Sequence, residues 1–123
     1  MLEIRDFEPD LPWSAQFEEP DPGPVTVINT FVVPAGQYEP FAEAWRLGFE
    51  LIKVAPGFVS AKLLRGIGQS RVVTVVAVWE SVADLRAVLG SPEFKELLPL
   101  YPDGTVLYPA LEREIDIPGL RDT

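Results

Sequence analysis

The sequence contains no histidine and no cysteine, and only one methionine among its 123 residues. Without histidine or cysteine the chain cannot form a serine–histidine–aspartate triad, a thiolate nucleophile, a histidine-ligated zinc or heme site, or a disulfide. Most common nucleophilic and metal-dependent enzyme mechanisms are therefore excluded, and no metal or other cofactor is predicted.

Basic residues are also scarce, since 10 lysines and arginines face 19 acidic residues and give a formal net charge of −9. A negative charge repels nucleic-acid backbones and anionic membrane surfaces. The first ten residues are acidic where a signal peptide is basic, and no apolar run approaches the ~18 residues of a membrane span. We expect a cytoplasmic protein with neither nucleic acid nor a membrane as a partner. Its length suits one domain.

The first 24 residues differ in composition from the rest and are called here the N-terminal arm. They hold seven acidic residues, one arginine and five of the 13 prolines. Because proline lacks an N–H donor, we expect an extended segment rather than a helix or a central strand. A solvated acidic tail is one interpretation. The large apolar residues Leu11, Trp13 and Phe17 favour the other, in which Trp13 and Phe17 dock on this subunit or a neighbouring one.

Beyond the arm, strand and helix patterns alternate. Segments rich in β-branched residues or with period-two alternation predict strands at 25–33, 58–65, 71–80 and 111–117. Apolar residues at helical spacing, with suitable caps, predict helices at 41–55, at 82–89 after an N-cap at Ser81, and at 92–98. This β-α-β-β-α-β order predicts an α+β, ferredoxin-like antiparallel sheet covered by helices on one face.

The third predicted strand is apolar on both faces: Val73, Val75 and Ala77 point one way, and Val72, Val76 and Val78 the other. Because the helices cover only one face, we expect a second copy of the chain to cover the other. The predicted assembly is a homodimer with its sheets packed face to face. The predicted organisation is an arm at 1–24, a domain at 25–117 and a C-terminal tail at 118–123.

Short motifs follow one another along the predicted domain: Phe31-Val32-Val33-Pro34-Ala35-Gly36, Phe41 and Trp45, Pro56-Gly57-Phe58, Leu63-Leu64-Arg65, Trp79-Glu80-Ser81 and Ser91-Pro92-Glu93-Phe94. Their order and spacing resemble the antibiotic biosynthesis monooxygenase family over about residues 25–117. The resemblance implies a dimeric α+β barrel. Because this fold hosts cofactor-free oxygenases, heme-degrading enzymes, isomerases and proteins without known activity, it does not by itself define a reaction.

Two branches of the family can be compared with the sequence residue by residue. Asn29 and Trp79 are similar to the heme-degrading branch, but the position of its heme-ligating histidine holds Leu98, which cannot bind iron. The quinone-forming branch resembles the chain at Trp79, but Val75 and Leu85 occupy the positions of its asparagine and tyrosine. The sequence therefore lacks at least one characteristic residue of each branch.

Cofactor-free oxygenation needs a dry pocket that stabilises the enolate of an electron-rich aromatic substrate. An amide at Asn29, an indole N–H at Trp79 and a cation at Arg65 suit that task, and we take them as candidate catalytic residues. The candidate pocket residues are Tyr38, Trp45, Leu85, Leu98 and Tyr101. The sequence does not identify the base, for which a carboxylate of raised pKa or a tyrosine is needed.

Each candidate also has a structural interpretation. Asn29 can bond neighbouring backbone, Trp79 and Trp45 can fill the core, and Arg65 can pair with an acid near the hairpin turn.

Three functions stay open: a cofactor-independent monooxygenase acting on an anthrone, hydroquinone or similar polyketide-like substrate, a non-catalytic small-molecule or heme-binding dimer, and a protein whose main product is its dimer interface. A cavity of ~300 Å³ or more between sheet and helices favours the first, and a filled interior favours the third.

Overall fold

The computed structural model describes residues 2–18 and 23–120; residues 19–22 of the arm and 121–123 of the tail lie outside the described residues. The strands are β1 (Glu3–Ile4), β2 (Val25–Val32), β3 (Phe58–Arg65), β4 (Val72–Trp79) and β5 (Val106–Glu112). The helices are α1 (Trp13–Gln16), α2 (Tyr38–Ile52), α3 (Val82–Leu89) and α4 (Pro92–Lys95), followed by a 3-10 turn at Leu98–Leu100. One sheet of order β1-β5-β2-β4-β3 holds all five strands.

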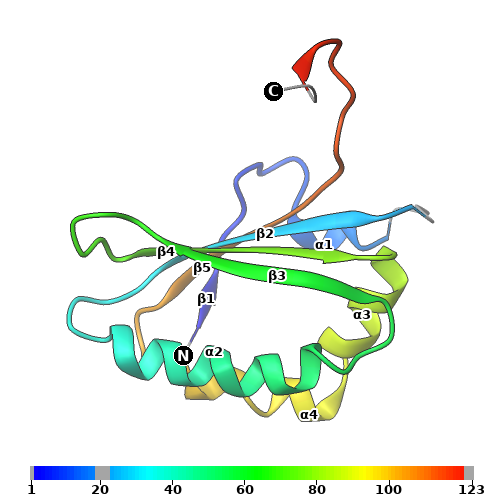
Figure 1. The fold of residues 1–123 in the computed structure, drawn as a ribbon. Helices are drawn as coiled ribbons and strands as arrows, with labels where there is room; N and C mark the ends of the chain where they lie inside the picture. The colour runs from blue at the N-terminus through cyan, green and yellow to red at the C-terminus, as the bar shows by residue number, and fades with distance from the viewer. Residues whose placement is uncertain (1, 19–22, 121–123) are drawn as a thin grey trace.

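The order of elements from β2 to β5 confirms the predicted ferredoxin-like α+β fold. The central strand β2 pairs antiparallel with both β4 and β5, and β3 pairs antiparallel with β4. Helices α2, α3 and α4 lie on one side of the sheet (Figure 1). No described helix is long and apolar enough to cross a membrane.

Local signals at the turns explain where the elements begin. The Ser81 hydroxyl accepts a hydrogen bond of 3.1 Å from the Asp84 N–H and thereby caps α3, as predicted. Gly57, before β3, has a φ of +86°, and a Cβ at this position would collide with the Asp84 side chain. The turn between α2 and β3 therefore requires glycine on both conformational and steric grounds.

The last strand lies earlier in the chain than the sequence pattern predicted. The prediction placed it at 111–117, whereas β5 ends at Glu112 and residues 113–117 have no regular structure. Strand β5 contains Pro109, which has no N–H to donate to a neighbouring strand. This proline is accommodated because its ring nitrogen points to the same edge as the backbone groups of Leu107 and Leu111, which contact the arm rather than β2.

The arm is not fully extended, in contrast to the prediction. Its first residues form β1, which pairs parallel with β5, and Trp13–Gln16 form a single helical turn. Phe17 is buried in the core, and Trp13 packs edge-on against it with ring centroids 5.2 Å apart. Both rings therefore dock on the subunit itself.

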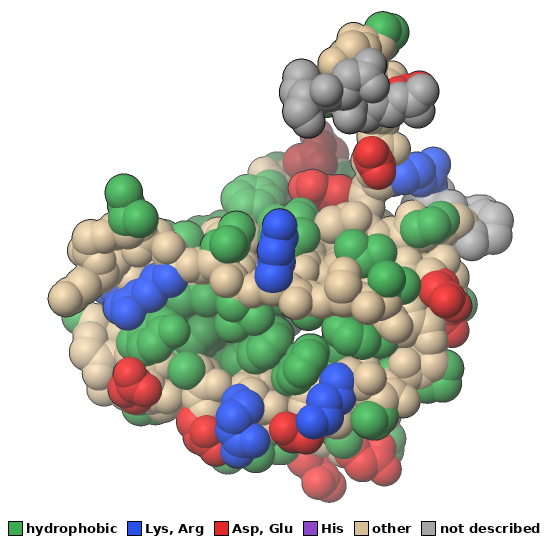
Figure 2. Space-filling view, viewed as in Figure 1, with side chains coloured by type: hydrophobic (Ala, Val, Ile, Leu, Met, Phe, Trp, Pro, Cys, Tyr) green, Lys and Arg blue, Asp and Glu red, His purple; other side chains and the backbone are tan. Residues whose placement is uncertain are grey.

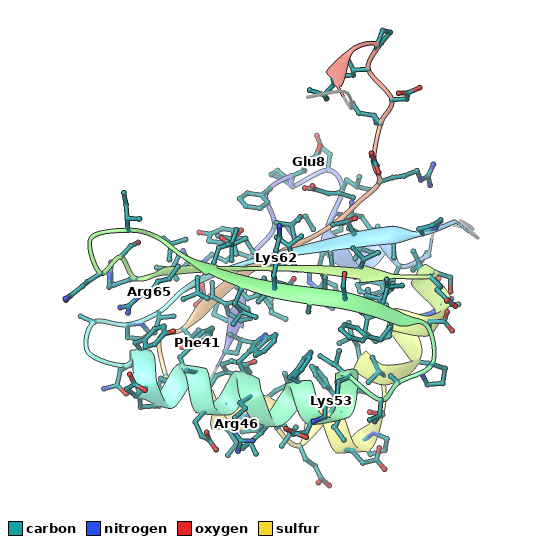
Figure 3. All side chains as sticks on the ribbon, in the orientation of Figure 1. Glu8, Phe41, Arg46, Lys53, Lys62 and Arg65 are labelled. Atoms are coloured by element: carbon teal, nitrogen blue, oxygen red, sulfur yellow. The ribbon has the colours of Figure 1, made fainter. Side chains whose placement is uncertain are left out.

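The core lies between the sheet and the helices. Trp79 from β4 and Phe41 from α2 are each only 1% exposed, and Phe41 points from α2 toward the sheet (Figure 3). The other face of the sheet carries Thr26, Ile28, Thr30 and Val32 from β2 and Thr74, Val76 and Val78 from β4, all of them half-buried. This largely apolar face has no helix over it (Figure 1).

Candidate functional site

A cavity of about 180 Å³ lies between the sheet and α2. Its walls are almost entirely apolar, and Figure 2 shows a hollow lined by hydrophobic side chains between β3 and α2. The described residues that line it come from every layer of the fold: Leu2, Ile4, Trp13, Phe17, Val27, Asn29, Phe31, Trp45, Gly48, Phe49, Ile52, Ala61, Val75, Ala77, Trp79, Leu85, Leu89, Phe94, Leu98, Tyr101, Leu107, Pro109, Ala110 and Leu111. The interior is therefore not filled. The cavity is nevertheless smaller than the ~300 Å³ that we expected for a monooxygenase.

Asn29 places an amide in this apolar space. It lies on β2 opposite Val75 of β4 and Pro109 of β5, and its side chain is on the helix-covered face of the sheet. Among the described residues its amide has no hydrogen-bond partner, so the predicted alternative of a bond to neighbouring backbone is not realised. A polar group left unpaired on an apolar wall costs free energy unless a ligand or water bonds it.

Tyr101 and Trp79 also place polar groups in residues of the wall. The Tyr101 ring is buried, stacked on Phe31 at 5.8 Å between centroids and tilted against Phe41 at 5.7 Å. Burial raises the pKa of Tyr101, so its hydroxyl stays protonated near neutral pH and acts as a donor. The Trp79 indole, at the end of β4, packs edge-on against Phe58.

Aromatic and aliphatic side chains hold the remaining walls. Trp45 from α2 is stacked on Phe49 with centroids 5.2 Å apart, and both line the cavity. Leu85 from α3 and Leu98 from the 3-10 turn close the same space. The structure therefore brings together six of the eight predicted site residues: Asn29, Trp45, Trp79, Leu85, Leu98 and Tyr101.

Arg65 and Tyr38 lie elsewhere. The Arg65 guanidinium stacks over the Tyr38 ring at 3.9 Å and donates a hydrogen bond of 3.0 Å to the Ser70 carbonyl. Both residues border a separate depression near the turn that follows β2. Arg65 bonds hairpin backbone and not, as one interpretation had it, an acid; neither residue lines the apolar cavity.

The cations nearest the opening belong to α2 and β3. Arg46 and Lys53 of α2 are paired with Glu43 and Glu50 on the outer side of the helix, and hydrogen bonding to Arg46 lowers the pKa of Glu43. Lys62 extends from β3 (Figure 3). The acid–base chemistry of the helix surface is thus separated from the cavity.

The chemical capacity of the cavity follows from its composition. Its described lining contains no aspartate, glutamate, lysine, arginine or histidine, and Tyr101 is its only titratable group. No cluster of three potential metal ligands is found within residues 2–18 and 23–120. The site can therefore donate hydrogen bonds to a bound oxygen atom, but none of these residues is a base at neutral pH.

Sequence reasoning missed the part of the wall that the arm supplies. Leu2, Ile4, Trp13 and Phe17 line the cavity together with the domain residues. The apolar residues of the acidic arm predicted docking, but nothing in their spacing indicated that they dock against the site itself.

Known proteins were compared with the chain. The family model described as "Antibiotic biosynthesis monooxygenase" matches residues 24–99. No curated protein matches. Among solved structures, SnoaB from Streptomyces nogalater, described as a cofactor-independent oxygenase, is 22% identical with a TM-score of 0.70 over 79% of this chain and 98% of SnoaB.

A predicted monooxygenase from Shewanella loihica PV-4 is 31% identical with a TM-score of 0.63, over 77% of this chain and 97% of its own. The family model covers more than half of the chain, and this relative exceeds 30% identity over more than two thirds of it. The order of strands, the motifs from Phe31 to Phe94 and these matches agree. The chain therefore belongs to the antibiotic biosynthesis monooxygenase family.

Proposed function

We propose that this protein is a cofactor-independent monooxygenase that oxidises an electron-rich aromatic compound of the hydroquinone type. The observation that carries the proposal is the half-buried Asn29 amide, which lines the apolar cavity and makes no side-chain hydrogen bond to the described residues. The description of SnoaB as a cofactor-independent oxygenase supports the same reaction class.

The reaction is balanced without a cofactor. A hydroquinone loses a phenolic proton to give a phenolate, the enolate form of the ring, which passes one electron to O₂. The resulting radical and superoxide form a C–O bond at a ring C–H carbon, and protonation of the peroxide gives a hydroperoxide. Loss of the proton from that carbon and cleavage of the O–O bond leave a carbonyl there and release water. One oxygen atom enters the substrate and the other is reduced to water.

The protein's task in this scheme is to stabilise the enolate oxygen. Hydrogen bonds to a developing oxyanion are strong in a cavity that excludes water, and removing one such donor typically slows a reaction by about 10²–10³-fold. We assign this role to the Asn29 side-chain N–H₂, with the Trp79 indole N–H and the Tyr101 hydroxyl as further donors from residues that line the cavity.

The proton is released by the substrate's own acidity in this proposal. The described cavity wall carries no carboxylate, and the raised pKa of Tyr101 removes it as a base. The rate should therefore rise with pH as the substrate ionises. The midpoint of the pH–rate profile should move when a substrate of different acidity is used. A midpoint that stays fixed across substrates would identify a protein base instead.

Oxygen uptake over a panel of hydroquinones with one or two fused rings tests the proposal. We expect protein-dependent uptake above autoxidation, with one ¹⁸O atom from ¹⁸O₂ in each product molecule and no hydrogen peroxide. Trp79→Phe, which keeps a ring and removes the N–H, and Asn29→Leu should both lower this rate. Uptake equal to that of the protein-free control across the panel would overturn the proposal.

A second candidate function is a non-catalytic binding protein of the same family. The observation in its favour is the size of the cavity, about 180 Å³, together with the missing base. This alternative predicts tight binding of an aromatic compound with no oxygen uptake.

We also propose that the functional unit is a homodimer formed by the uncovered sheet faces. Val76 and Ile28 lie side by side in the middle of that face, and the cation Lys62 is paired opposite Val76. This largely apolar face lies on the side of the sheet opposite the helices. We expect a second copy of the chain to pack against it, with an interface on the order of 2,000 Å² in total.

A further inference from the structure

The arm is fastened to the edge of the sheet at two points. At its start, the Glu3 and Arg5 N–H groups donate to the Thr105 and Leu107 carbonyls, each at 2.9 Å. At its end, the Gln16 side chain bonds the backbone of Leu111.

Helix α3 adds a third attachment, because Arg86 donates a hydrogen bond of 2.7 Å to the Phe17 carbonyl. The segment between these points is held across the β5 edge of the cavity.

Four apolar side chains of the arm line the cavity from this edge: Leu2, Ile4, Trp13 and Phe17. The hollow visible between β3 and α2 lies at the opposite edge of the sheet, since β3 and β1 are the two outer strands (Figure 2). The arm thus forms one end of the space and the mouth forms the other.

The family match begins at residue 24, and 79% of this chain suffices to cover 98% of SnoaB. The end wall is therefore an addition to the matched domain.

We propose that the arm sets the length of the aromatic ligand, with Trp13 and Phe17 as specificity-determining residues that admit one or two fused rings and exclude three. The identity of this ligand as a substrate rests on the proposed function, but the size limit does not. An engineered apolar cavity of about 150 Å³ binds a single benzene ring. A space of about 180 Å³ closed at one end has room for a ligand little larger than that.

Trp13 can be changed with less damage to the fold than Phe17. Its side chain is half-buried, whereas Phe17 is only 9% exposed and belongs to the core. Truncating Trp13 removes a large ring from the end of the cavity and leaves the attachments of Gln16 and Arg86 in place.

The size limit can be recognised from the order in which ligands of two and three rings bind. In an unrestricted apolar site a third ring buries more apolar area and binds more tightly. Behind a fixed wall the same ring collides with Trp13, and the order of affinities is reversed.

Quenching of tryptophan fluorescence measures this order, because all three tryptophans of the chain line the cavity. The probes are 1,4-naphthoquinone-2-sulfonate and anthraquinone-2-sulfonate, which differ by one ring and carry the same charge. We expect the wild type to bind the two-ring probe at least tenfold more tightly. In Trp13→Ala the three-ring probe should gain at least tenfold in affinity, while the two-ring probe changes little.

Phe7→Ala is the matched control, since Phe7 is an arm aromatic that stacks on Tyr108 and does not line the cavity. It should keep the wild-type order. If Trp13→Ala fails to fold, Trp13→Leu provides a smaller truncation with the same expected direction.

Equal or tighter binding of the three-ring probe by the wild type would overturn the size limit, as would an unchanged order in a folded Trp13 variant. Quinone binding requires no turnover. A protein that shows the size limit but no oxygen uptake would therefore support the role of the arm and contradict only the proposed monooxygenase activity.

Discussion

The Gln16 side chain makes the two hydrogen bonds that an adjacent strand would make with Leu111, 95 residues away. Its Nε2 donates to the Leu111 carbonyl at 2.9 Å, and its Oε1 accepts from the Leu111 N–H at 2.9 Å. A primary amide presents N–H donors and an acceptor oxygen side by side, as the N–H and C=O of a single residue do along the edge of an extended strand. This pair closes the edge of β5 where β1 has already ended, and it places the neighbouring Phe17 and Trp13 against the cavity.

Replacing Gln16 by glutamate should release the end of the arm. The carboxylate has no donor for the Leu111 carbonyl, so one bond is lost and two acceptors face each other. We expect a loss of about 1–2 kcal/mol in the free energy of unfolding, measured by urea denaturation. Gln37→Glu, at an exposed glutamine without a side-chain hydrogen bond among the described residues, is the control. Equal stability of the Gln16 variant and wild type would show that the pair contributes nothing.

Asn29→Leu should separate stability from activity. Because the Asn29 amide has no partner within the described residues, replacing it by an apolar side chain removes an unpaired polar group from an apolar wall. We expect the melting temperature to stay the same or rise, while protein-dependent oxygen uptake falls by at least tenfold. A variant that is both less stable and fully active would return Asn29 to a purely structural role.

Tyr101 gives the protein a stability loss at high pH. Its pKa is raised by burial, so between the unfolded and folded pKa values the unfolded chain loses the proton and the folded chain keeps it. Ionisation then favours unfolding, and this contribution falls by about 1.4 kcal/mol per pH unit above pH ~10. Tyr101→Phe should unfold less steeply with pH in that range, as followed by circular dichroism. Tyr38→Phe controls for the loss of a hydroxyl and should retain the wild-type steepness.

The proposed dimer predicts a sharp effect of one charge on the uncovered face. Val76→Lys introduces a second cation directly opposite Lys62 in the sheet register. Two cations in an apolar contact repel each other and cannot be desolvated cheaply, so light scattering should report a monomer. Val54→Lys, at a residue 75% exposed beyond α2, should remain a dimer. A wild-type monomer at micromolar concentration would refute the proposed assembly.

Helices α2, α3 and α4 and three of the predicted strands follow from signals that are local in the sequence, although α2 lies three residues earlier than predicted and α4 ends at Lys95 instead of 98. β2, β3 and β4 begin and end within a residue of their predicted bounds, because their β-branched runs are bounded by glycine and proline turns. The alternating residues 111–117 predicted a strand as well, but Ile115 and Ile117 are exposed and find no partner strand in the described chain. Pairing with β2 starts instead at Val106, opposite Val32.

The site was predictable where one strand or helix carries the chemistry. Asn29 is conspicuous as an amide among β-branched residues on β2, and Trp79 and Trp45 lie on faces that the strand and helix periods define. Arg65 was placed in the site by its residue type, but its guanidinium bonds the hairpin backbone. The contribution of Trp13 depends on the contact between Gln16 and Leu111, which no local pattern encodes.

The residues of the cavity also predict that the protein does not degrade heme. The position that resembles the histidine ligand of the heme-degrading branch holds Leu98, which lines the cavity with an aliphatic side chain. Tyr101 is the remaining axial candidate, but iron binds the phenolate, and burial between Phe31 and Phe41 raises the pKa of Tyr101. Hemin and ascorbate under air should therefore lose the Soret band no faster with the protein than without it. Protein-dependent loss that Tyr101→Phe or Asn29→Ala abolishes would assign the chain to the heme-degrading branch.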